Sequence, residues 1–286
     1  MAVPVMRAVR RGSARRVRAL GDLLAGFGAQ VTFYARAVAA VPRTLVRYRR
    51  HVARQVAEIS FGSASLFAGG GTIGVVFAMS FVASTQVGME GYRGLDLIGL
   101  TPMSGLMSAM VNTRELAPLV AGVALAAKVG TGFTAQLGAM RISDEIDALE
   151  SMAVRSLPFL VSTRMAAAFL SVVPLYLVGL FASYLATRVA VVVVQGQSGG
   201  TYDFYFQLLL SPSDVVLSLV KAVVFAMVVT LVHCFYGYYA TGGPEGVGRA
   251  AGRALRASIV AITFTDMVLT LLFWGLSPSL PALGVR

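Results

Sequence analysis

"ISFGSASLFAGGGTIGVVFAMSFVASTQVGM", Ile59 to Met89, is a run of 31 residues without Asp, Glu, Lys or Arg. Two more uncharged runs of 23 residues follow, Met165 to Thr187 and Ala222 to Pro244. Each exceeds the roughly 20 residues that an α-helix needs to cross the hydrocarbon core of a bilayer. The chain of 286 residues is 57% hydrophobic and 13% charged, whereas soluble domains average about a quarter charged residues. These features predict an all-α polytopic membrane protein.

The apolar segments predict five transmembrane spans. They are expected at about 61–87, 97–127, 159–194, 215–240 and 257–276. Asp266 lies in the fifth span, and Arg114 and Glu115 interrupt the second. Charges at such a depth are costly, so an ion pair, a helix break at Pro118 and a substrate contact all fit the Arg114–Glu115 pair. The glycine-rich connections at 195–214 and 241–256 are expected to be loops.

Arginine dominates the N-terminal region, where residues 1–54 hold twelve arginines and one acid. We expect a basic cytoplasmic leader over residues 1–19 that contacts anionic lipid headgroups rather than nucleic acid. From Leu20 to Tyr48 apolar residues recur at gaps of 4 and 3, which predicts an amphipathic helix over 20–57. Pro42 is expected to kink or divide this helix.

The polar face of this helix carries nearly all of its charge as arginine. Because acids are scarce there, the pattern favours a helix in the membrane interface over a coiled coil. A helix packed on its own protein also fits. The basic residues of this face are Arg36, Arg43, Arg47, Arg50 and Arg54.

The distribution of basic residues predicts the orientation. Cytoplasmic loops carry an excess of Lys and Arg, and Lys128, Arg141 and Arg155 flank the connection between the second and third spans. The connection before the fifth span is also arginine-rich, whereas the opposite connections keep little beyond Arg93. We therefore expect a cytoplasmic N-terminus and an outer C-terminus.

The stretch "MRISDEIDALESMAV", residues 140–154, places four acids on the expected cytoplasmic side. With Ser143 as N-cap, it predicts a short amphipathic helix over 142–153. Ile142, Ile146 and Leu149 would form its apolar face. Docking of a soluble motor protein and a merely solvated surface helix fit this pattern equally well.

Motifs for covalent chemistry are absent from the sequence. There is no GxxxxGK[ST] loop, HExxH, CxxC or GxSxG motif. The single cysteine, Cys234, excludes an internal disulfide. We predict no catalytic, cofactor-binding or metal-binding residues. The function classes that remain are a channel, a secondary transporter and the membrane subunit of a larger complex.

Two segments resemble the MlaE/YrbE permease family. "ELAPLVAGVALAAKVGTGFTAQLGAMRISDEIDALESMAV", residues 115–154, is similar to its central signature, and "ATGGPEGVGRA", residues 240–250, is a second match. The resemblance suggests a permease domain over 58–278, followed by a short outer tail, 279–286. The residues of these motifs are Glu115, Pro118, Lys128, Gly130, Gln136, Gly138, Gly242, Gly243, Glu245, Gly246, Gly248 and Arg249.

The family resemblance implies a noncatalytic membrane subunit of an ABC-type lipid transporter. It implies a second permease subunit, a cytoplasmic ATPase that binds ATP and Mg, MCE proteins on the outer side, and a lipid substrate. In that family "EIDAL" lies in the coupling helix. The expected ATPase contacts are therefore Asp144, Glu145, Asp147, Ala148, Leu149 and Glu150.

The chain departs from the family pattern at Lys128, where Arg is common, and at Gln136, where Glu is common. These departures suggest one specialised member of a heterodimer. Composition and the basic leader resemble the YrbE subunits of actinobacterial Mce systems, which implies the inner (plasma) membrane of a mycobacterial-type cell envelope. The cargo implied is fatty acid, mycolic-type lipid or sterol, moved inward. A self-sufficient secondary transporter and a structural scaffold of an envelope complex are the alternatives.

Overall fold

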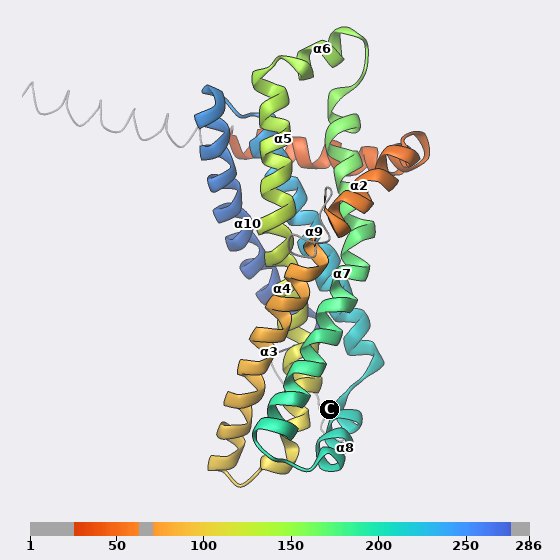
Figure 1. Cartoon of the computed structure of the whole chain (residues 1–286). Helices are drawn as coiled ribbons and strands as arrows, with labels where there is room; N and C mark the ends of the chain where they lie inside the picture. The colour runs from red at the N-terminus through yellow and green to blue at the C-terminus, as the bar shows by residue number, and fades with distance from the viewer. Residues whose placement is uncertain (1–25, 63–70, 276–286) are drawn as a thin grey trace, which may run out of the picture.

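The computed structural model describes residues 26–62 and 71–275 (Figure 1). The basic leader, the first residues of the expected interfacial helix and the outer tail lie outside the described residues. In the described part the chain is helical with no strand, and five helices of 27 to 42 residues are long and apolar enough to span a membrane. The prediction of an all-α polytopic membrane protein is confirmed.

The five spans form one elongated bundle (Figure 1). The first is α3 (Gly71–Leu97), the fourth is α9 (Pro212–Tyr238) and the fifth is α10 (Gly243–Trp274). The second and third are each built from several stretches with different helical winding. The second contains η2 (Thr101–Ser104), η3 (Met107–Leu116), α4 (Ala117–Ala124), η4 (Leu125–Gly130) and α5 (Thr131–Ile142), and the third contains η5 (Pro158–Ser162), α7 (Thr163–Arg188) and η6 (Val189–Val194).

The core of the bundle is centred on α7. Its side chains Met165, Leu175 and Tyr176 are fully buried, and small residues such as Ala167 and Ala182 allow neighbouring helices to approach closely. In contrast, α10 is the least buried of the spans. Its side chains therefore face lipid or another protein along most of its length.

The N-terminal helix is interrupted once in the described residues. Residues 26–47 are helical through Pro42, the chain turns at Tyr48, and α2 follows (Arg49–Phe61). The helix is therefore not divided at Pro42, as one form of the prediction had it; its interruption lies at Tyr48, six residues later. Phe33 packs on Phe235 with ring centroids 5.4 Å apart. One edge of the helix thus contacts the bundle.

The other edge of the same helix is uncovered. Phe27, Val31 and Val38 are exposed although they are apolar. A soluble surface would rarely present such a row of large apolar side chains. Packing on the protein and exposure of an apolar edge therefore occur together, and the exposed edge fits a helix lying in the membrane interface.

Both glycine-rich connections contain helix, which corrects the loops expected there. The first holds α8 (Gly199–Leu209), and the second is the beginning of α10. The chain turns into α10 at Gly242, whose φ of 90° favours glycine. A Cβ at Gly246 would lie 1.9 Å from the carbonyl oxygen of Thr241, so the turn excludes any side chain there.

The short acidic helix is present but smaller than expected. It is α6 (Glu145–Ser151), rather than the 142–153 expected from the sequence. Ile142 ends α5, and Asp144 occupies the N-cap position with a φ of 57° and no side-chain cap. Ser143 was expected to cap the helix, but its hydroxyl donates to the Ala139 carbonyl in the preceding turn. Figure 1 shows α6 projecting beyond the end of the bundle.

Candidate functional site

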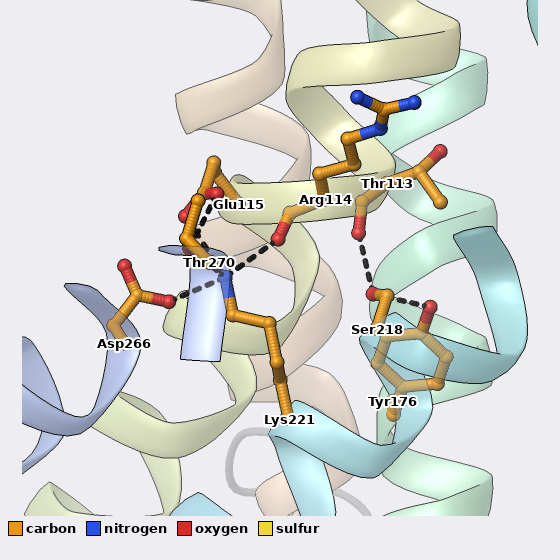
Figure 2. Close-up of polar contacts among 8 residues, drawn as sticks. All are labelled: Thr113, Arg114, Glu115, Tyr176, Ser218, Lys221, Asp266 and Thr270. Atoms are coloured by element: carbon orange, nitrogen blue, oxygen red, sulfur yellow. Dashed lines mark hydrogen bonds and ion pairs between the residues drawn. The ribbon is translucent and has the colours of Figure 1, made fainter. Parts of the chain in front are cut away.

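A cluster of charged side chains lies inside the bundle where η3, α9 and α10 meet (Figure 2). Its centre is Lys221 on α9, whose side chain is fully buried. The Nζ atom of Lys221 lies 2.7 Å from Oδ1 of Asp266 and 3.0 Å from Oε2 of Glu115. It also donates to the Arg114 carbonyl oxygen and to Thr270 Oγ1, both at 2.8 Å.

The polar groups around Lys221 come from two other spans. Glu115 belongs to η3, a π-helical stretch, and π-helical turns are frequent at functional sites. Asp266 and Thr270 lie one turn apart on α10, and the Thr270 hydroxyl donates to Oε1 of Glu115 at 2.9 Å. One ammonium group therefore joins elements that are far apart in the sequence.

A second ion pair lies beside the first. The Arg114 guanidinium donates to Oδ2 of Asp214 through Nε at 3.1 Å and through a terminal nitrogen at 2.8 Å. The Trp274 indole donates to Oδ1 of the same carboxylate at 2.8 Å. Both Arg114 and Lys221 lie over the Trp274 ring, 5.3 and 5.5 Å from its centroid. Trp274 thus closes one end of the cluster.

The charges of this cluster do not balance. Two cations face three carboxylates, since Lys221 alone serves both Glu115 and Asp266. A hollow of about 290 Å³ adjoins these groups. It is lined by Met110 and Val111 beside Glu115, Arg114, Thr270 and Trp274. The site therefore combines polar groups with an apolar wall, as an amphiphilic ligand requires.

The structure places the charges noted in the sequence in one site. Arg114, Glu115 and Asp266 meet there. Arg114 and Glu115 each form an ion pair, with Asp214 and Lys221 respectively, and do not pair with each other. The helix does not break at Pro118, which is buried in α4. Sequence reasoning missed Lys221 and Asp214. The sequence could have identified Lys221, because it is a lone cation within an apolar segment.

Several family-motif glycines are required by packing. A Cβ at Gly130 would lie 2.5 Å from the His233 ring, and one at Gly138 would lie 2.7 Å from Val247. Gly248, in contrast, faces open space. Glu245 and Arg249 form an exposed ion pair at 2.9 Å, one turn apart on α10.

Gln136 contacts a buried arginine. Its Oε1 accepts a hydrogen bond at 3.1 Å from Arg164, which also donates to the Leu160 carbonyl. Arg164 has no carboxylate partner in the part of the chain that the structure describes, and its Nε is unsatisfied there. The Phe133 ring lies 5.5 Å from this guanidinium. The other departure from the family pattern, Lys128, is exposed.

The residues expected at the ATPase contact differ in their surroundings. Asp144, Glu145 and Ala148 are exposed, while Leu149 is half-buried. Asp147 pairs with Arg141 at 2.7 Å.

The Glu150 carboxylate accepts hydrogen bonds from Ser156 and from Tyr238 of α9. Glu150 thus joins α6 to the bundle. Of the expected apolar face, Ile146 is fully buried and Ile142 is exposed. Met152, beyond the end of α6, is exposed as well. The tip of the bundle therefore presents acids beside uncovered apolar side chains.

The arginines of the N-terminal helices fall into two groups. Arg36, Arg43 and Arg47 line a hollow beside the chain that leaves α6. Arg50 is exposed on α2, and Arg54 pairs with Glu58 at 3.3 Å.

These features describe a multi-pass helical membrane protein with a polar site inside its bundle. The family model "Permease MlaE" matches residues 61–272. The chain therefore belongs to the MlaE permease family.

Proteins that are similar in sequence to this chain include probable ABC transporter permeases. The chain is 30% identical over 209 residues to a probable ABC transporter permease protein of Rickettsia bellii, covering 73% of this chain and 81% of that protein. It is 30% identical over 203 residues to one of Synechocystis sp., covering 69% and 77%. It is 28% identical over 197 residues to Protein TRIGALACTOSYLDIACYLGLYCEROL 1, chloroplastic, of Arabidopsis thaliana, covering 68% and 56%.

Proposed function

We propose that this chain is the noncatalytic permease subunit of an ATP-driven lipid transporter. The observation that carries the proposal is α6, an acidic helix that projects from the end of a permease bundle. Its exposed Glu145 and Ala148, with Ile142 and Met152 beside them, offer both charge and apolar area to a protein partner. A cytoplasmic ATPase that binds ATP and Mg would dock there.

A lipid cargo is supported by two observations. The Arabidopsis relative carries the name of a galactolipid. The hollow beside Glu115 has an apolar wall next to charged groups, which suits a molecule with a polar head and an apolar tail. We propose fatty acid, mycolic-type lipid or sterol as the cargo class, moved inward.

The remaining components follow from the family resemblance. We propose a second permease subunit and MCE proteins, as in actinobacterial Mce systems, in the inner (plasma) membrane. The α6 end would face the cytoplasm, because Arg141 lies in the last turn of α5 and Arg155 follows α6, and Figure 1 shows these segments at that end of the bundle. The poorly buried α10 leaves room for a second permease subunit.

The test is co-purification of the ATPase with charge-reversal variants. Glu145→Lys reverses an exposed acid on α6, and we expect ATPase recovery to fall while membrane insertion is kept. Glu90→Lys is the matched control, since Glu90 is an exposed acid on α3 at the opposite end of the bundle. Undiminished recovery with Glu145→Lys would refute docking at α6.

The two alternatives make different predictions. A self-sufficient secondary transporter is favoured by the unbalanced charges around Lys221, and the chain alone would then move lipid in vesicles under an ion gradient without ATP. A structural scaffold would leave lipid uptake intact in Glu145→Lys cells. Pull-down from native membranes that recovers an ATPase and a bound lipid would reject the self-sufficient secondary transporter, and loss of lipid uptake in Glu145→Lys cells would reject the scaffold.

A further inference from the structure

A second hollow lies away from the charge cluster, between the N-terminal helix and the segment that follows α6. Its volume is about 770 Å³. Arg36, Arg43 and Arg47 reach it from the helix, and their spacing places them on one helical face. Arg155 reaches it from the connection between α6 and α7. Figure 1 shows this helix, in red, running across the bundle below α6.

The four guanidinium groups have no carboxylate partner among the described residues. Within residues 26–62 and 71–275, none of them has a carboxylate oxygen within 4.0 Å. Other arginines in the same part of the chain do, including Arg54, Arg141 and Arg249. No acid lines this hollow. Four like charges around one space repel each other unless an anion occupies it.

Glu150 lines an adjoining hollow of about 410 Å³ together with Arg36 and Arg155. Its carboxylate accepts hydrogen bonds from Ser156 and Tyr238. The Glu150 carboxylate is therefore held by two hydroxyl groups, and it forms no ion pair with Arg36 or Arg155. The positive charge of the larger hollow is therefore available to a ligand.

The lining indicates the chemistry of that ligand. Arginine binds phosphate through two parallel hydrogen bonds, which a lysine cannot form. Tyr48 adds a hydroxyl group, whereas the Thr44 hydroxyl already donates to the Ala40 carbonyl. Ala40, Leu157 and Pro158 add an apolar wall. The same helix exposes Val38 and Val46, as a helix in the membrane interface does. A phosphate attached to an apolar group fits better than a free anion.

We propose that this hollow binds the phosphate headgroup of an anionic phospholipid of the surrounding membrane. The four arginines hold the phosphate oxygens, and the acyl chains lie along the apolar edge of the helix. Such a lipid also joins the N-terminal helix to Arg155, four residues beyond the end of α6. If α6 is the ATPase contact, as the proposed function has it, membrane charge would then regulate coupling.

The experiment measures lipid binding to the purified full chain in detergent. Native mass spectrometry would follow binding of cardiolipin and phosphatidylglycerol, with phosphatidylcholine as the neutral lipid. The variant Arg43→Gln/Arg155→Gln removes two charges from the hollow, and the control Arg50→Gln/Arg54→Gln removes two charges from α2 outside it. We expect about tenfold weaker cardiolipin binding for the first variant and little change for the control.

Equal losses in both variants would overturn the proposal, because binding would then follow net charge alone. Inorganic phosphate that displaces the lipid at equal concentration would also overturn it, by assigning the hollow to a free anion. Photocrosslinking of the wild-type chain provides a test that does not depend on whether the variants fold. A photoreactive phosphatidylglycerol should crosslink to residues 36–48 or 153–158, and crosslinks confined to other segments would refute the site. Since only this chain is used, the result is independent of ATPase docking.

Discussion

The ammonium of Lys221 and the carboxylate of Asp266 lie 2.7 Å apart inside the bundle, although 45 positions separate the two residues in the sequence. Glu115 shares the same ammonium at 3.0 Å. A single buried cation thus holds carboxylates from two other spans. The cost of removing one of these three charges depends on which charge is removed.

Lys221→Met should be strongly destabilising. It leaves two carboxylates facing each other in a low-dielectric site, and breaking a buried ion pair costs about 3–5 kcal/mol. Asp266→Asn should be much milder, because Lys221 keeps Glu115 as a partner. Thermal unfolding of the purified chain in detergent measures both. Lys128→Met is the matched control at an exposed lysine, and a Lys221→Met chain as stable as this control would contradict the expectation.

Gln136→Glu should stabilise the protein. Arg164 is buried, and within the described residues its guanidinium donates to the Gln136 amide oxygen and the Leu160 carbonyl and lies over the Phe133 ring. A carboxylate at position 136 would pair with it, and hydrogen bonds between charged groups are about twice as strong as neutral ones.

The measurement is the unfolding midpoint, which we expect to rise by roughly 2–4 °C. Gln207→Glu on α8 introduces the same change at an exposed position and should have little effect. A midpoint that is lowered by Gln136→Glu would mean that Arg164 is already balanced by a group outside the described residues.

The spans could be predicted from the sequence because hydropathy depends on local composition alone. All five were found, and the third, at Pro158–Val194, lies within one residue of the expected 159–194, but the ends of the second and fifth differ from those expected. The α10 helix begins at Gly243, well before its apolar part, because the left-handed turn at Gly242 and the ion pair of Glu245 with Arg249 start the helix in a polar segment. Likewise, α8 was read as a loop because its glycines and aromatics are typical of connections.

The charged site could be predicted only in part. Arg114, Glu115 and Asp266 stood out as charges in apolar segments, but nothing in the sequence shows which of them share a partner. That relationship depends on the packing of η3, α9 and α10. The arginine-lined hollow was equally hidden, because the pattern of the N-terminal helix predicted a basic face without indicating Arg155 as the residue opposite.

Ala153→Gly should stabilise the end of α6. Ala153 has a φ of 58°, and its amide and that of Val154 donate to the carbonyls of Glu150 and Leu149. This arrangement ends a helix with a left-handed residue, where glycine is the usual choice. A left-handed alanine costs roughly 1–2 kcal/mol.

Hydrogen exchange of residues 145–156 measures the effect, and Ala153→Gly should slow it. Ala148→Gly is the matched control, because the same substitution inside α6 should speed exchange by costing about 1 kcal/mol of helix stability. Equal effects of the two glycines would show that the backbone at Ala153 is not strained in the protein.

The packing of α2 should weaken in mild acid because of His51. Its ring stacks on Phe159 with centroids 5.4 Å apart. Burial, with the neighbouring Arg164 charge as a second cause, lowers the pKa of His51 below its ordinary value of 6.5. The unfolded chain therefore binds a proton more readily than the folded chain, so stability is highest above pH 6.5 and falls as the pH drops from 6.5 towards the folded pKa. Unfolding midpoints at about pH 7.5 and 5.5 should differ in the wild type and converge in His51→Gln, which cannot titrate. A pH dependence that is unchanged in His51→Gln would assign it to another group.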